Sequence, residues 1–113
     1  MVKNYIPKQG DIIYLDLNPT KGYEQQGKRP AIVVSKDLFN RYSNMVMVCP
    51  ITSTYKNFPT HYVLEDTKKI NGTVLCEHIR SIDFRSRNVT FIEKASDKDL
   101  LSIIMLTTVC IEG

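Results

Sequence analysis

The sequence predicts a mainly β (α+β) fold: a small, strongly bent β-barrel of five or six short strands, closed or covered by one C-terminal α-helix. Short runs of β-branched and aromatic residues recur between residues 10 and 93, separated by turn-forming residues. A long apolar pattern at helical spacing follows residue 96. Because helices do not alternate with strands, an α/β sheet is disfavoured. The length suits a single core, so we expect one domain, residues 1–113.

The first half of the chain predicts three strands and a short helix. Residues 10–17 alternate between two faces, which is typical of a strand with one face in the core. Residues 31–35 are apolar and β-branched and predict an inner strand, while residues 35–42 favour one or two helical turns capped by Ser35. Residues 46–53 predict a further strand in which Pro50 marks a bulge or an edge position.

The second half predicts weaker strands and the terminal helix. Residues 61–65 and 73–79 are expected strands, and Asn71-Gly72 between them favours a tight hairpin turn with positive φ. Residues 89–93 predict a last strand, and Ser96-Asp-Lys-Asp99 resembles a capping box. The apolar residues expected to face the core from the helix are Leu100, Leu101, Ile103, Ile104, Leu106 and Val109. This face is broad enough for part of it to meet a second subunit.

Composition indicates a cytoplasmic protein. Net charge is only +3, a mild tilt toward polyanions. Cys49, Cys76 and Cys110 lack the spacing of a zinc site or a disulfide framework, and we expect all three to be small buried hydrophobes in a reducing compartment. The N-terminus has no apolar region typical of a secretion signal. No apolar run approaches the roughly 20 residues that a membrane helix needs.

The most informative segment is the polar stretch from Gly22 to Pro30, which leads into an apolar strand. Pro30 fixes its own φ and stiffens the place where Arg29 is held. Further polar residues stand at strand ends, and the full set is Glu24, Arg29, Thr52, Ser53, Glu77, His78, Arg80, Arg85 and Arg87. Taken singly, each has an ordinary interpretation as a surface charge, strand filler or structural histidine.

Taken together, these motifs resemble those of the MazF/PemK/Kid toxins of bacterial toxin–antitoxin pairs. The resemblance covers about two-thirds of the chain, in order and without large gaps. The matching motifs are Gly10-Asp11, Leu17-Asn-Pro19, Gly22-Tyr-Glu-Gln-Gln-Gly-Lys-Arg-Pro30, Val48-Cys-Pro-Ile-Thr-Ser53 and Glu77-His-Ile-Arg-Ser-Ile-Asp83. The resemblance implies a small SH3-like barrel that dimerises and cleaves single-stranded RNA at short sequences, without a metal or other cofactor.

The resemblance also assigns roles to individual residues. Arg29 and Thr52 match the residues that carry cleavage, and Glu24 matches the acid of the loop motif. Glu77 falls where relatives have an acidic residue that contributes to the RNA site. His78 departs from the family, because many relatives have Gln there.

Cleavage without a metal uses the 2′-hydroxyl of the RNA to attack the adjacent phosphorus, and the resemblance implies 2′,3′-cyclic phosphate and 5′-hydroxyl products. The guanidinium of Arg29 suits the doubly anionic phosphorane, and the Thr52 hydroxyl suits a single positioned hydrogen bond. Glu24 either accepts the 2′-OH proton or orients Arg29. A rival arrangement uses the imidazole of His78 as acid or base.

Base selection requires unpaired RNA, whose base edges are exposed. Tyr23 is a candidate for stacking on a base. The residues that we expect to bind or read the strand are Tyr23, Gln25, Lys28, Ser53, Lys56, Glu77, His78 and Arg80.

The leading hypothesis is a sequence-specific endoribonuclease that degrades mRNA and arrests growth. The resemblance implies an acidic, MazE-like antitoxin as its protein partner and a homodimer as its assembly, with no membrane. The alternative is a non-catalytic toxin or nucleic-acid-binding module on the same barrel, such as a topoisomerase poison. A folded domain without any nucleic-acid role ranks last.

Overall fold

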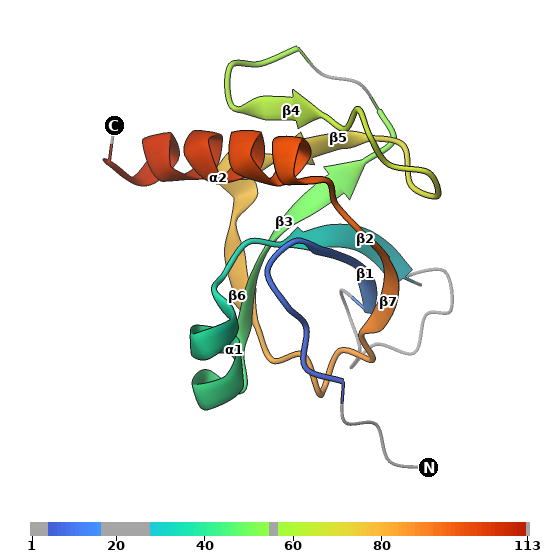
Figure 1. Ribbon diagram of the computed structural model, residues 1–113, viewed down its shortest axis with the longest axis vertical. Helices are drawn as coiled ribbons and strands as arrows, with labels where there is room; N and C mark the ends of the chain where they lie inside the picture. The colour runs from blue at the N-terminus through green and yellow to red at the C-terminus, as the bar shows by residue number, and fades with distance from the viewer. Residues whose placement is uncertain (1–4, 17–27, 55–56, 113) are drawn as a thin grey trace.

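A bent antiparallel sheet with one long helix across it forms the body of the molecule (Figure 1). The computed structural model describes residues 5–16, 28–54 and 57–112. The strands in this part of the chain are β1 (Asp11–Asp16), β2 (Lys28–Val33), β3 (Val46–Thr52), β4 (His61–Val63), β5 (Thr73–Leu75), β6 (Arg80–Ile82) and β7 (Thr90–Lys94). The helical elements are α1 (Asp37–Ser43), the 3₁₀ turn η2 (Cys76–His78) and α2 (Asp97–Glu112).

The strand order is β4-β5-β3-β2-β1-β7, and β6 pairs with β3 beside β5. The predicted mainly β fold with a C-terminal helix is therefore confirmed. Over the described ranges the hydrogen-bonded path does not return to its first strand, so the barrel is open rather than closed. These ranges hold seven strands instead of five or six.

The additional strand arises because the expected strand 73–79 is interrupted. β5 ends at Leu75, residues 76–78 form η2, and a separate strand, β6, begins at Arg80, beyond the expected range. The backbone N–H of Cys76 donates to the carbonyl of Thr60 at 3.1 Å, a contact across the β4–β5 hairpin that bends the chain there. β5 and β6 consequently pair with different parts of β3.

Pro50 lies in the interior of the sheet and not at an outer edge. On one side of β3 it pairs with Ala31 of β2. On the other side, β3 pairs with β6 as far as Val48 and with β5 from Ile51 onward. Pro50 thus lies between the part of β3 that pairs with β6 and the part that pairs with β5. The missing backbone N–H of a proline is tolerated at such a position.

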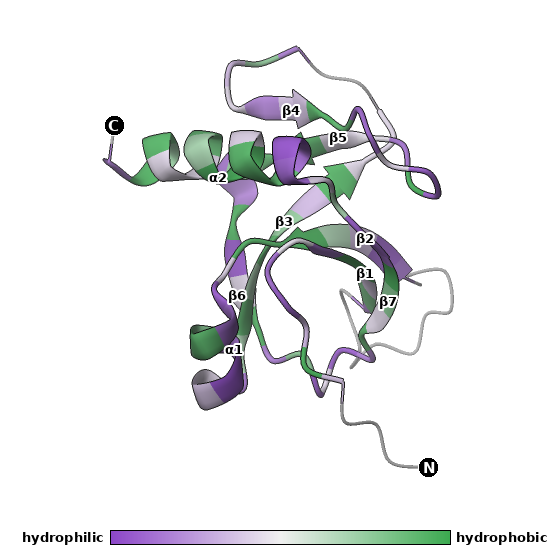
Figure 2. Cartoon of the chain, in the orientation of Figure 1, coloured by the Kyte–Doolittle hydropathy of each residue, from purple (hydrophilic) through white to green (hydrophobic). Residues whose placement is uncertain are grey.

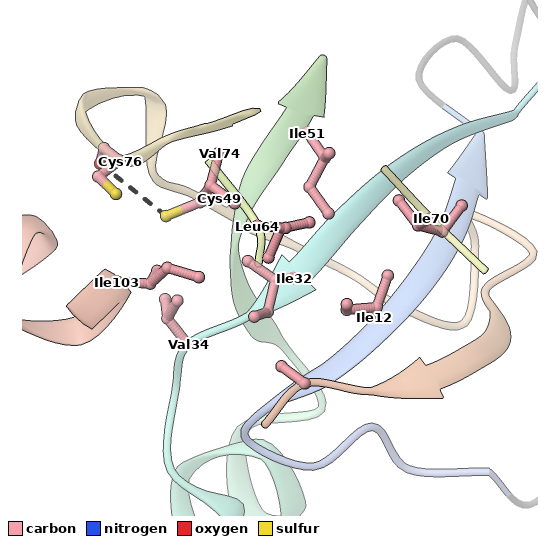
Figure 3. Close-up of a cluster of buried hydrophobic side chains, with 11 residues drawn as sticks. Ile12, Ile32, Val34, Cys49, Ile51, Leu64, Ile70, Val74, Cys76 and Ile103 are labelled. Atoms are coloured by element: carbon pink, nitrogen blue, oxygen red, sulfur yellow. Dashed lines mark hydrogen bonds between the residues drawn. The ribbon is translucent and has the colours of Figure 1, made fainter. Parts of the chain in front are cut away.

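Both faces of β1 are buried, which corrects the expectation of a strand with one face in the core. Ile12 and Ile13 are each 0% exposed although they point to opposite sides of the sheet. Ile12 belongs to the cluster between the sheet and α2, together with Ile32 and Ile103 (Figure 3). Ile13 belongs to a second cluster on the other side of the sheet, with Ile82.

The cysteines divide into two groups. Cys49 and Cys76 are buried in the cluster of Figure 3, and burial raises the pKa of Cys49 to about 12 and that of Cys76 to about 11. Both thiols therefore behave as small neutral hydrophobes, as expected. Cys110 lies exposed near the end of α2, which corrects the expectation that it is buried.

The N-terminus of α2 is capped as predicted, by the Ser96 hydroxyl accepting the N–H of Asp99 at 3.0 Å. The Asp99 carboxylate turns into the core instead of completing a capping box, where it accepts from the Tyr62 hydroxyl at 2.6 Å. Ile103 is fully buried, but Leu101 and Val109 are 62% and 54% exposed, which corrects their assignment to the core.

Two local predictions are wrong. Lys36, not Ser35, is the N-cap of α1, and the hydroxyl of buried Ser35 instead bonds the Asn40 side chain. Residues 64–72 connect β4 and β5, so Asn71-Gly72 is the end of a longer loop and Gly72 does not have positive φ. No helix in the described part of the chain is long and apolar enough to cross a membrane.

Candidate functional site

A pocket of about 300 Å³ lies where the start of β2 meets the end of β3. We call it the Arg29 pocket. Its lining residues are Leu15, Arg29, Pro30, Ala31, Val48, Pro50, Ile51, Thr52, Leu75, His78, Arg80 and Ile82. Most of the apolar residues come from strand interiors, and Leu75 and Ile82 are the last residues of β5 and β6. The polar residues come from near strand ends or from η2. A rigid apolar floor thus carries a few polar side chains, which is the usual composition of a ligand site.

Arg29 and Thr52 both line this pocket, Arg29 from β2 and Thr52 from β3. These two strands are adjacent and antiparallel. Ala31 of β2 pairs with Pro50 of β3. When this register is continued by two residues, Arg29 stands opposite Thr52. Each residue is paired in register on its other side, Arg29 with Leu15 and Thr52 with Thr73, which fixes the two backbones beside the pocket.

The Thr52 hydroxyl is oriented by its own chain. Its Oγ1 accepts the backbone N–H of Thr54 at 3.2 Å. This bond uses an oxygen lone pair and not the hydroxyl proton, so Thr52 keeps the ability to donate to a bound acceptor. An anionic oxygen in the pocket is an acceptor of that kind.

The polar lining of the Arg29 pocket is basic. Arg29 and Arg80 contribute guanidinium groups and His78 an imidazole, and none of the described lining residues is acidic. Guanidinium groups pair well with phosphate oxygens because their planar N–H fork matches two of them. The pocket is therefore suited to an anion such as a phosphodiester.

Glu77 is held beside the pocket and does not line it. Its Oε1 accepts the Thr60 hydroxyl at 2.7 Å, and its Oε2 lies 2.7 Å from His61 Nε2 and 3.5 Å from His78 Nε2. Burial raises the pKa of Glu77, but the hydrogen bonds from Thr60 and His61 outweigh it and the net pKa is lower than 4.5. The carboxylate is therefore ionised near neutral pH.

The remaining predicted site residues lie in different places. Lys28 and Ser53 are exposed next to Arg29 and Thr52 in the chain but do not line the pocket. Arg85 lies over the Phe84 ring at 5.6 Å, and Arg87 Nη1 donates to the Asp16 carbonyl at 3.1 Å. The predictions for Tyr23, Glu24, Gln25 and Lys56 lie outside the described residues.

Sequence reasoning missed Thr60 and His61, the two residues that hold Glu77. Thr60 directly precedes β4 and His61 is its first residue, and this three-residue strand is too short to show a sequence pattern. A larger hollow of about 600 Å³ near Tyr5, Asp37 and Arg41 contains none of the predicted site residues. The Arg29 pocket therefore remains the candidate site.

The fold is shared with toxins of type II toxin-antitoxin systems. Residues 8–105 match the family described as PemK-like, MazF-like toxin of type II toxin-antitoxin system, and this chain belongs to that family. The chain is 39% identical over 90 residues to the endoribonuclease toxin MazF of Escherichia coli (strain K12), covering 80% of each sequence.

Solved structures agree with this assignment. MazF (Form-I) from Deinococcus radiodurans superposes with a TM-score of 0.84 at 31% identity, covering 97% of this chain and 100% of that one. A MazE-MazF structure (Form-II) from the same organism has a TM-score of 0.84 at 28% identity, covering 96% and 98%. The fold is shared more widely, because a mycobacterial endoribonuclease in complex with its cognate antitoxin has a TM-score of 0.78 at 20% identity, covering 93% and 94%.

Proposed function

We propose that this chain is a sequence-specific, metal-independent endoribonuclease that cleaves single-stranded mRNA as the toxin of a toxin–antitoxin pair. The observation that carries the proposal is that Arg29 and Thr52 line one basic pocket from adjacent strands. Membership of the toxin family and 39% identity to an endoribonuclease toxin support it.

In the proposed reaction the 2′-hydroxyl of the RNA attacks the adjacent phosphorus, and the 5′-oxygen of the next nucleotide leaves. The products are a 2′,3′-cyclic phosphate and a 5′-hydroxyl end. Arg29 pairs with the non-bridging oxygens as negative charge grows on them. Thr52 donates its hydroxyl to one of the same oxygens. Glu24 accepts the 2′-OH proton or orients Arg29.

Recognition of the RNA uses residues around this centre. Arg80 and His78 line the pocket and contact the strand directly, while Lys28 and Ser53 extend the contact surface on either side. Tyr23, Gln25 and Lys56 complete the set through stacking and hydrogen bonding. Single-stranded RNA is the appropriate substrate because its bases are free to enter a pocket.

The proposed protein partners are an acidic antitoxin and a second copy of the chain, in the cytoplasm. An acidic segment complements the basic lining of the Arg29 pocket, so it occupies the place of the RNA. Exposed apolar residues spaced four apart on α2, namely Leu101, Met105 and Val109, form a strip suited to a homodimer contact. Figure 2 shows that α2 is largely hydrophobic after its hydrophilic first turn.

The test is cleavage of a long single-stranded RNA by the purified chain in EDTA, followed by sequencing of the new 5′ ends. Discrete fragments with 5′-hydroxyl ends at a recurring short sequence are expected. Arg29→Ala should abolish them, whereas Arg85→Ala, an exposed arginine outside the pocket, should not. Intact RNA together with inhibition of a DNA topoisomerase would instead establish the non-catalytic alternative.

A further inference from the structure

A network of four side chains connects the start of β4 with the wall of the Arg29 pocket. One carboxylate, that of Glu77, is its centre. Thr60 and His61 bind this carboxylate at 2.7 Å each, and His78 Nε2 lies 3.5 Å from the same oxygen that His61 contacts. Of the four residues, His78 alone lines the pocket.

The first part of this network is rigid. The His61 side chain is only 9% exposed, and its ring packs against Phe58 with centroids 5.2 Å apart. His61 also pairs in register with Leu75, directly before η2. The carbonyl of Thr60 accepts the N–H of Cys76, so backbone and side chain of the same residue both hold the η2 turn.

The last part of the network is exposed by comparison. The His78 side chain is 59% exposed, and it stands at the C-terminal end of a three-residue 3₁₀ turn. The Glu77 carboxylate, itself held by Thr60 and His61, lies 3.5 Å from Nε2 of this imidazole. Without those two donors, the carboxylate, whose side chain is 30% exposed, would turn toward water and lose its fixed place beside His78.

We propose that Thr60 and His61 are positioning residues of the RNA site: through Glu77 they fix the imidazole of His78 in the wall of the Arg29 pocket, where it contacts the bound nucleotide. The expected effect on RNA binding rests on the proposed function. The positioning of His78 rests only on the contacts within the network. Neither Thr60 nor His61 touches the substrate.

A double-mutant cycle, measured on a defined RNA oligonucleotide, tests whether His61 affects RNA binding through His78. His61→Ala should lower kcat/KM by about tenfold, mainly through KM, and broaden the choice of cut site. In a His78→Ala background the same substitution should change kcat/KM by less than about twofold, because its effect passes through His78. His61→Gln, whose amide nitrogen can replace Nε2 as donor to Glu77, should recover most of the loss. If the losses of kcat/KM in His61→Ala and His78→Ala multiplied in the double variant, the proposal would be overturned.

NMR tests whether Thr60 and His61 position His78, and it does not depend on cleavage of RNA. The chain has only two histidines, so His61→Ala leaves a single imidazole, that of His78. Its ring signals should shift in His61→Ala and in Thr60→Val relative to the unsubstituted chain, and return in His61→Gln. Unchanged signals in folded variants would sink the proposal. Failure of the unsubstituted chain to cleave any RNA would count against the proposed function alone.

Discussion

Gly72 approaches the backbone of Thr52 so closely that a Cβ atom on it would lie 2.7 Å from the Thr52 carbonyl oxygen. The same atom would lie 2.7 Å from Cγ2 of Ile51. Both distances are below any ordinary carbon contact, so the last residues of β3 keep their position only because residue 72 has no side chain.

Gly72→Ala should therefore lower stability and activity together. We expect a loss of about 1–3 kcal/mol in the free energy of unfolding, because the backbone carbonyl cannot move aside cheaply. Cleavage should fall because the displaced residue is Thr52. Urea denaturation and RNA cleavage measure the two effects. Asn71→Ala, at an exposed neighbour, is the control, and unchanged stability in Gly72→Ala would contradict the prediction.

Thr52→Val should reduce kcat by about 10²-fold while leaving the fold intact, because valine keeps the shape and removes the donor. Thr52→Ser keeps the hydroxyl and should retain most of the activity. Thr54→Val serves as a control, since the backbone N–H that Thr52 accepts is unaffected. Single-turnover cleavage assays report the rates. Equal activity of the Val and Ser variants would rule out a role for the hydroxyl.

Glu93 should make the protein sensitive to acid. Its carboxylate accepts the backbone N–H groups of Lys68, Lys69 and Ile70 at 2.8–3.0 Å. Burial raises the pKa of Glu93, but these hydrogen bonds outweigh it and the net pKa is below 4.5. The folded state therefore holds the ionised form of Glu93 more strongly than the unfolded chain does. The resulting stabilisation is complete above pH 4.5 and is lost as the pH falls through the folded-state pKa.

Glu93→Gln should accordingly lower the free energy of unfolding by about 1–3 kcal/mol near neutral pH. The difference from the unsubstituted chain should shrink as pH falls below 4.5. Urea denaturation at a series of pH values measures it. A difference that stays constant down to about pH 3 would show that the charge of Glu93 contributes nothing.

Met105→Glu should convert a dimer to a monomer, because it places a charge in the middle of the apolar strip on α2. Sedimentation velocity gives the mass. Thr90→Glu, an equally charged substitution at an exposed position of β7, should leave the dimer unchanged. A substituted chain that still sediments as a dimer would place the contact elsewhere.

The elements that sequence reasoning predicted correctly are those set by local patterns. Residues 11–16 and 46–52 alternate or cluster apolar side chains, and Ser96 caps α2 through a bond within its own turn. The apolar run predicts the second strand at residues 31–35, but it spans 28–33, because its polar first residues pair with β1. The end of the strand at Leu75 could not be predicted, because it is accompanied by a bond from Cys76 to Thr60, a residue far away in the chain that precedes β4. Leu101 and Val109 have helical spacing toward the core, but the sheet covers only one side of α2.

The site could be predicted only in part for the same reason. Motif resemblance named Arg29 and Thr52, but their meeting in one pocket follows from the register between β2 and β3, which no single segment reveals. His61 gave no signal, because its importance arises from a contact with Glu77 across the hairpin.

The change of partner along β3 at Pro50 separates two tasks of the molecule. Arg29 pairs with Leu15 of β1 and Thr52 with Thr73 of β5. His78 and Arg80 instead belong to the segment that runs from η2 into β6, which pairs with β3 before Pro50. Under the proposed function, we therefore expect substitutions in that segment to alter which RNA sequence is selected without disturbing Arg29 and Thr52. A toxin built in this way can acquire new targets while its chemistry stays the same.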